Sequence, residues 1–265
     1  MGPVNCLHQL ISSQLDMDRL DYLRRDSFFT GVTEGNIGSA RIIKMLNVVD
    51  DSLVVEQKGI YSLENYLTTR RLMYWQVYLH RTCVAYEKVL VNMLHRAKEL
   101  TRAGRQVFAS PALAYFLTND VDAAWFNSHP EALSYYEELD DSDIWSAMKA
   151  WKHDDDTILR TLASDMLDRH IFKVEVNEEP FSEEKMEAIS DTIAQQLGIT
   201  AAEARRYMMS VNTIQKDMYN VDDDSIAILY KNGEIKDISE ASELLNVQLL
   251  SKKIRKYYLC YQRIE

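Results

Sequence analysis

The chain has 265 residues, of which 46% are hydrophobic, and its few glycines (8) and prolines (4) disfavour turn-rich sandwich and barrel folds. Its net charge of -11 repels phosphate backbones and argues against general nucleic-acid binding. No apolar stretch is long enough to cross a bilayer, the first residues do not resemble a secretion signal, and the three cysteines are scattered. We therefore expect a mainly helical, cytoplasmic protein with reduced thiols and no membrane partner.

Hydrophobic periodicity and turn residues predict the elements of the first hundred residues. In chain order they are a helix over residues 1–28, a glycine-rich loop over 29–38, a short helix over 39–46, two strands around an Asp50–Asp51 turn, and a helical segment over 62–102. Because the last segment contains no glycine or proline and is long for one globular helix, we expect a kink near Thr82 and Cys83.

The rest of the chain changes character after Asp168. The predicted elements are a helix that Ser110 and Pro111 open, helices at 144–151 and 157–168, a strand over 171–176, a helix over 183–197 closed by Gly198, a hairpin through Asn232 and Gly233, a helix from Ser239, and a strand over 256–261. Trp145, Met148 and Trp151 lie on one helical face and are expected in the core. We predict a helical region over 1–170 and a small α+β lobe over 171–265.

The densest polar cluster runs from Asp16 to Asp26. On a helix, Asp18, Tyr22 and either Arg25 or Asp26 share one face. A carboxylate for metal, an aromatic platform and a phosphate-binding cation would be arranged in this way. The same pattern is also typical of an exposed, salt-bridged helix face. The residues alone leave both interpretations open.

The segment from Ile11 to Val32 closely resembles the second-half motif of HD-domain phosphohydrolases. The nearest group is the one related to the SAM-and-HD-domain deoxynucleoside triphosphate triphosphohydrolases, whose helix carries Asp-x-Asp-[Lys/Arg]-x-Asp-Tyr-x-x-Arg-Asp. This resemblance implies the following roles: a metal ligand at Asp18, a phosphate-contacting cation at Arg19, a tyrosine near the nucleotide sugar at Tyr22, and the carboxylate after it at Asp26.

A second segment, Leu67 to Arg81, is similar to the family's Thr-Arg…Tyr-x-His-[Lys/Arg] helix. The resemblance places Arg70 at a phosphate and Tyr78 at the base or sugar, although Leu79 replaces a polar residue that some members use. Two arginines could grip a triphosphate bidentately, a geometry that lysine cannot reproduce.

By this resemblance the implied reaction is hydrolysis of a nucleoside triphosphate to nucleoside and triphosphate, with Mn, Mg or Fe as the divalent metal, in a homo-oligomer. The family's other metal ligands, a histidine and a His-Asp doublet, lie upstream of its Asp18 position. Here only His8 precedes Asp18, and the one His-Asp doublet, His153–Asp154, lies downstream. The chain therefore resembles the C-terminal part of such an enzyme, and we expect it to be inactive alone.

The alternative is a non-catalytic module for nucleotide binding, regulation or oligomerisation. The one basic run, Lys252 to Lys256, is expected to be a solvated face or a contact for an anion or an acidic subunit. Tyr257, Tyr258 and Tyr261 are interpreted as a packed strand rather than a platform for nucleic-acid bases.

Overall fold

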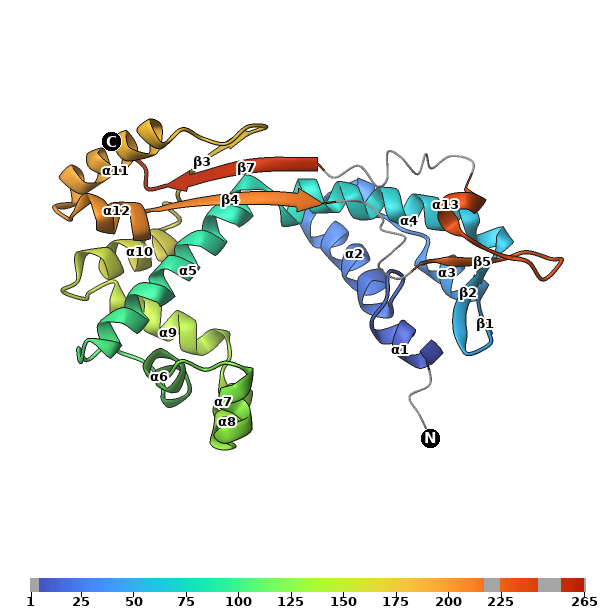
Figure 1. Cartoon of the computed structure of the whole chain (residues 1–265), viewed down its shortest axis with the longest axis horizontal. Helices are drawn as coiled ribbons and strands as arrows, with labels where there is room; N and C mark the ends of the chain where they lie inside the picture. The colour runs from blue at the N-terminus through green and yellow to red at the C-terminus, as the bar shows by residue number, and fades with distance from the viewer. Residues whose placement is uncertain (1–4, 217–224, 243–253, 265) are drawn as a thin grey trace. The chain divides into compact units, whose positions relative to one another are not determined.

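The computed structural model describes residues 5–216, 225–242 and 254–264 (Figure 1). The chain divides into two compact units, the first from residues 1–80 and 215–255 and the second from 81–214 and 256–265. Helices predominate and each unit carries one small sheet, which confirms the predicted mainly α fold with a smaller α+β part. Within the described ranges, no helix combines the length and the apolar character needed to cross a membrane.

The first unit surrounds a four-stranded sheet in the order β1-β2-β5-β6. Its main elements are α1 (Asn5–Ile11), α2 (Met17–Thr30), α3 (Ser39–Met45), β1 (Leu46–Val49), β2 (Ser52–Glu56), α4 (Ile60–Met73), the π-helical turn η3 (Tyr74–Tyr78), β5 (Ala227–Leu229), β6 (Ile235–Asp237) and α13 (Ile238–Ala241). As predicted, β1 and β2 form a hairpin through Asp50 and Asp51, both left-handed with φ of 48° and 58°. The Asn232–Gly233 hairpin, β5–β6, is also confirmed.

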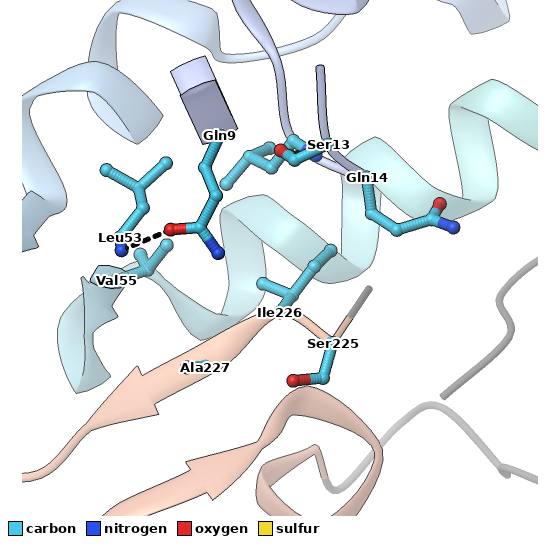
Figure 2. Close-up of a pocket in the computed structure, with 9 residues that line it drawn as sticks. Gln9, Ser13, Gln14, Leu53, Val55, Ser225, Ile226 and Ala227 are labelled. Atoms are coloured by element: carbon cyan, nitrogen blue, oxygen red, sulfur yellow. Dashed lines mark hydrogen bonds between the residues drawn. The ribbon is translucent and has the colours of Figure 1, made fainter. Parts of the chain in front are cut away.

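Long-range contacts hold this unit together. Strand β2 pairs in parallel with β5, so that Val54 lies opposite Ala227. The backbone N–H of Leu53 donates to Gln9 Oε1 at 2.7 Å and thereby joins α1 to β2 (Figure 2). Around these contacts the helices and strands bury one apolar core, which includes Leu23, Ile42, Val55, Leu63, Leu67, Met73, Ile228 and Ile238.

The predicted single helix over residues 1–28 is wrong. Helix α1 ends at Ile11, and α2 begins at Met17 after a bend over residues 12–16. The side chain of Asp16 caps α2, since its carboxylate accepts the backbone N–H of Arg19 at 2.7 Å. The long helical segment is also interrupted a little before the predicted kink, at Leu79 and His80, directly after the π-helical turn.

The second unit is mostly helical, with a three-stranded sheet in the order β3-β7-β4. Its elements are α5 (Arg81–Arg102), α6 (Pro111–Thr118), α7 (Ala123–Ser128), α8 (Glu131–Glu138), α9 (Asp141–Trp151), α10 (Thr157–Asp168), β3 (Lys173–Asn177), α11 (Glu183–Leu197), α12 (Ala201–Tyr207), β4 (Met209–Lys216) and β7 (Ile254–Tyr261). The boundary predicted near residue 170 falls inside this unit, between α10 and β3, and stays a prediction.

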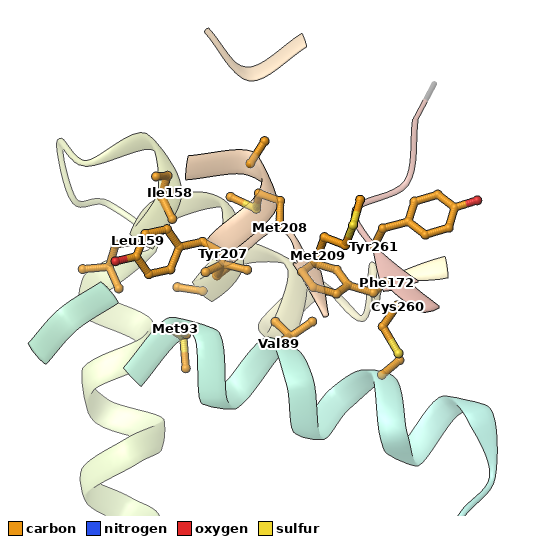
Figure 3. Packing of buried hydrophobic residues seen from close by; sticks show 14 of the residues in the cluster. Val89, Met93, Ile158, Leu159, Phe172, Tyr207, Met208, Met209, Cys260 and Tyr261 are labelled. Carbon is orange, nitrogen blue, oxygen red and sulfur yellow. The ribbon is translucent and has the colours of Figure 1, made fainter. Parts of the chain in front are cut away.

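Residues of α5, α10, α12 and the sheet form the core of this unit; Figure 3 shows, among others, Val89, Met93, Ile158, Leu159, Phe172, Tyr207 and Cys260. Buried Tyr258 and Tyr261 confirm the packed strand. The prediction for Trp145 is wrong: Met148 and Trp151 are buried, but Trp145 is 50% exposed because the inward face of α9 runs through Ala147 instead. Of the basic run, Lys252 and Lys253 lie outside the described residues.

Candidate functional site

Two rows of polar and aromatic side chains meet in the first unit, where α2 packs against α4. Side chains four residues apart share one face of a helix. Helix α2 contributes one such row, which consists of Asp18, Tyr22 and Asp26. Helix α4 and the π-helical turn contribute the other, which consists of Tyr66, Arg70, Tyr74 and Tyr78. The structure therefore brings together the two motifs that the sequence analysis singled out separately.

Direct contacts join the two rows at Tyr78. Its hydroxyl donates to Asp26 Oδ2 at 2.7 Å. The ring of Tyr22 meets that of Tyr78 edge to face, with centroids 5.7 Å apart, and Tyr74 lies 5.4 Å from Tyr78 in a similar geometry. Since Tyr74 and Tyr78 belong to a π-helical turn, this aromatic group occupies a kind of backbone feature that is frequent at functional sites.

The bend between α1 and α2 is the third side of the site. Fully buried Tyr66 donates its hydroxyl proton to the backbone carbonyl of Gln14 at 2.7 Å. Arg70 Nη1 donates to Gln14 Oε1 at 2.6 Å. The Arg19 guanidinium donates to the carbonyl oxygen of Ser13 and to the carboxylate of Asp16. Both arginines are thus held by the bend, which fixes their position before any ligand arrives.

A small pocket adjoins the bend (Figure 2). It has a volume of about 20 Å³ and is lined by residues of α1, the bend, β2 and the start of β5, among them Gln9, Ser13, Gln14 and Ile226. A cavity of this size has room for about one water molecule. It is too small for a substrate, so the candidate site is the face formed by α2, α4 and the π-helical turn rather than this pocket.

Hydrogen-bond donors dominate this face at neutral pH. Burial, reinforced by nearby Tyr74, raises the pKa of Tyr22 to about 12, although the positive charges of Arg70 and Arg19 act in the opposite direction. Burial and the carboxylate of Asp26 also raise the pKa of Tyr78. Both phenols are therefore protonated. Together with the Arg70 guanidinium, which lies over the Tyr74 ring at 5.9 Å, they form a surface suited to an anion with an aromatic or sugar part.

Asp18 lies in the first turn of α2, and its side chain is exposed. In the part of the chain that the structure describes, no three His, Cys, Asp or Glu side chains lie close enough together to hold a metal ion. Divalent metals need several oxygen or nitrogen ligands, so Asp18 alone does not form such a site. The described residues therefore do not fit a complete metal centre.

The downstream His153–Asp154 doublet has a structural role, which belongs to Asp154. The Asp154 carboxylate pairs with Arg105 and accepts the backbone N–H of Asp156 at 2.8 Å, which organises the turn before α10. His153 is exposed, as are His8, His80 and His95.

The sequence analysis missed three residues that build the site: Gln14, Tyr66 and Tyr74. A signal for the two tyrosines was present, because Tyr66, Arg70, Tyr74 and Tyr78 recur at intervals of four. Gln14 carries no such signal, since its role depends on a bend that the periodicity does not predict.

Comparisons with known proteins identify relatives of this chain. A family model described as the HD associated region matches residues 37–116. The crystal structure of a phosphohydrolase from Bacteroides thetaiotaomicron superposes with a TM-score of 0.93 at 60% identity, over 98% of this chain and 64% of that protein. The uncharacterized protein YwfO of Bacillus subtilis is 31% identical over 95% of this chain and 56% of its own length.

A more distant likeness points the same way. The deoxynucleoside triphosphate triphosphohydrolase SAMHD1 homolog of Dictyostelium discoideum is 26% identical over 36% of this chain and 18% of its own length. The fold and these matches together show a mainly α chain that is related to the HD-domain phosphohydrolases. The chain spans little more than half the length of the Bacillus relative.

Proposed function

We propose that this chain forms the substrate-binding part of a metal-dependent phosphohydrolase that acts on nucleoside triphosphates, deoxynucleoside triphosphates in particular. The observation that carries the proposal is the meeting of Tyr22, Arg70 and Tyr78 on one donor-rich face. The Bacteroides relative is named a phosphohydrolase and the Dictyostelium relative a deoxynucleoside triphosphate triphosphohydrolase homolog, and these names support the reaction class. By the same resemblance, we propose a homo-oligomer.

Each side chain has a distinct part in this proposal. Arg70 binds phosphate oxygens, because Gln14 holds its guanidinium next to the face. Tyr22 and Tyr78 pack against the sugar or base. Asp26 orients the Tyr78 ring by accepting its hydroxyl proton. Arg19 holds the bend and adds positive charge beside the phosphates.

Asp18 supplies one carboxylate of the metal site in this proposal. The metal, when bound, lowers the pKa of water and neutralises phosphate charge. Because Asp18 alone does not fit a metal ion, we propose that the 265 residues by themselves bind nucleotide without hydrolysing it.

The role of Asp18 is tested in the complete protein that the gene encodes, which contains these 265 residues. With manganese and a mixture of deoxynucleoside triphosphates, Asp18→Asn should reduce triphosphate release by about 100-fold or more, since loss of a metal ligand removes charge stabilisation. Asp21→Asn is the matched control, because Asp21 lies on the same helix, 61% exposed and paired with Arg25. Unchanged hydrolysis by Asp18→Asn would rule out the assigned role.

Calorimetry with dATP tests the binding face on the 265-residue chain. Arg70→Lys should weaken binding about tenfold, because lysine loses the planar fork that reaches two oxygens. Arg41→Lys changes an exposed arginine of the same unit and should bind like the wild type. Nucleotide binding by the gene product without any turnover would instead favour the non-catalytic module.

A further inference from the structure

A pocket of about 700 Å³ opens in the second unit, and its lining includes none of the residues of the proposed nucleotide site. It is lined by the end of α10 and the residues after it, by the last turn of α11, and by the residues that follow β7. Its volume is within the range of small-molecule sites, about 300–1,000 Å³. Its polar residues are Asp165, Arg169, His170, Gln196, Gln262 and Arg263.

Asp165 is the unusual residue of this pocket. It lies on the buried face of α10 together with Ile158 and Leu162, and it is only 6% exposed. The side chain of Gln262 hydrogen-bonds to the Asp165 carboxylate, but among the described residues Asp165 Oδ2 and Gln262 Oε1 have no hydrogen-bond partner. Two buried oxygen acceptors without donors are costly, and natural proteins rarely retain them without a reason.

The helix increases this cost. Asp165 lies in the last turn of α10, where its carbonyl oxygen accepts the backbone N–H groups of Arg169 and His170. A helix C-terminus carries partial negative charge, which disfavours an additional carboxylate there. Helix packing alone therefore does not explain an aspartate at this position, and a donor group supplied from outside would satisfy it.

Two arginines lie at the opening. Arg169 and Arg263 are exposed cations of the lining, although the whole chain has a net charge of -11, and the exposed His170 ring offers a further hydrogen-bonding group. Arg263 is held in place because its Nε donates to the backbone carbonyl of Ile171 at 3.1 Å. The pocket thus combines inner acceptors that lack donors with outer cations that attract an anion.

We propose that this pocket binds a small metabolite that carries both a primary ammonium group and an acidic group. The ammonium donates to Asp165 Oδ2 and Gln262 Oε1, and the carboxylate or phosphate meets Arg169, His170 and Arg263. An ammonium suits the inner site better than a neutral amide because it also neutralises the buried carboxylate. This site is independent of the proposed nucleotide site, since the two share no residue.

Calorimetry on the 265-residue chain at pH 7.5 tests the proposal with two matched pairs of probes. L-glutamate is compared with glutarate, and glucosamine 6-phosphate with glucose 6-phosphate. Each pair differs in the ammonium group, and the two pairs distinguish a carboxylate from a phosphate as the acidic group. We expect at least one amine to bind and its amine-free partner to bind about tenfold more weakly or not at all, as when a charge-assisted hydrogen bond is lost.

Two variants assign the binding to this pocket. Asp165→Asn should weaken binding of the amine about tenfold or more, because the charge that pairs with the ammonium is removed. Asp191→Asn removes an exposed carboxylate of α11 and should bind like the wild type. A thermal melt of each variant shows that it is folded. The proposal is overturned if neither amine binds, if glutarate or glucose 6-phosphate binds as tightly as its amine, or if Asp165→Asn binds unchanged.

Discussion

The candidate nucleotide site and the Asp165 pocket differ in how completely their buried polar atoms are hydrogen-bonded. In the first region Tyr66, Arg70 and Tyr78 each donate to a defined oxygen. In the second, within the described chain, Asp165 Oδ2 and Gln262 Oε1 accept from no donor. Polar groups that have partners stabilise the folded chain before a ligand binds. Buried oxygens without donors lower the free energy of unfolding, and a ligand that donates to them can restore it. Removing polar groups should therefore have opposite effects in the two regions.

The largest effect is expected for Asp165→Asn, as a gain of stability. Burial raises the pKa of Asp165 to about 6, from 3.8 for an unperturbed carboxyl. Below about pH 3 both folded and unfolded states bind this proton, and the carboxyl costs little. As the pH rises to about 6 the unfolded chain loses the proton more readily, so stability falls by about 3 kcal/mol and stays low above that. The neutral asparagine escapes this cost.

Urea unfolding of wild type and Asp165→Asn at a series of pH values between 4 and 8 measures the effect. The variant should exceed the wild type by only about 0.5 kcal/mol at pH 4 and by about 3 kcal/mol at pH 8. The Asp191→Asn control should show no pH-dependent difference, because that carboxylate is exposed. A variant that is less stable than the wild type at pH 8 would mean that the charged form of Asp165 is stabilised in the folded chain.

The opposite sign is expected in the candidate site for Tyr66→Phe. The change deletes a buried donor and leaves the carbonyl oxygen of Gln14 without it, which should lower stability by about 1–3 kcal/mol. Urea unfolding at pH 7 measures the loss. Tyr61→Phe, at a tyrosine that is 68% exposed on the same helix, should change stability by less than about 0.5 kcal/mol. Equal stability of the two variants would show that the bend is not held by this bond.

Local signals predicted most of the second unit. The spans of α10 and α11 match their predictions, because capping residues limit both helices: Asp156 and Ser182 cap their N-termini, and Gly198 adopts a φ of 65° at the end of α11. The helix after Ser110 and Pro111 and the Asn232–Gly233 turn are further examples. Each of these features depends on a few neighbouring residues, which is why sequence alone was sufficient.

The remaining features depend on contacts between distant residues. Apolar periodicity continues across residues 12–16, so the bend there depends on the Asp16 carboxylate, which accepts the backbone N–H of Arg19. The parallel pairing of Val54 with Ala227 joins segments that no local pattern relates. The sequence motifs identified Asp18, Tyr22, Asp26, Arg70 and Tyr78 as candidates, but which of them touch became visible only when α2 and α4 were placed together.

The smallest effect on stability is expected for Tyr78→Phe. This variant is informative because its effect on the free energy of unfolding can be compared with its effect on dATP binding. The lost hydrogen bond to Asp26 is only partly buried, so stability should fall by about 1 kcal/mol. The magnitude of the free energy of dATP binding should decrease by more than the free energy of unfolding. Without the phenol proton, the negative charge of Asp26 is uncompensated near the anionic nucleotide, and the Tyr78 ring loses its fixed orientation. Calorimetry with dATP and urea unfolding on the same variant measure the two quantities.

A double-mutant cycle with Asp26→Asn separates these causes. If the carboxylate repels the phosphates, Asp26→Asn should restore part of the dATP affinity that Tyr78→Phe loses, because the repelling charge is gone. If only ring orientation matters, each single variant should already show the full loss and the double variant should show no recovery. Additive losses from the two changes would mean that Tyr78 and Asp26 act independently, and the bond between them would then have no part in nucleotide binding.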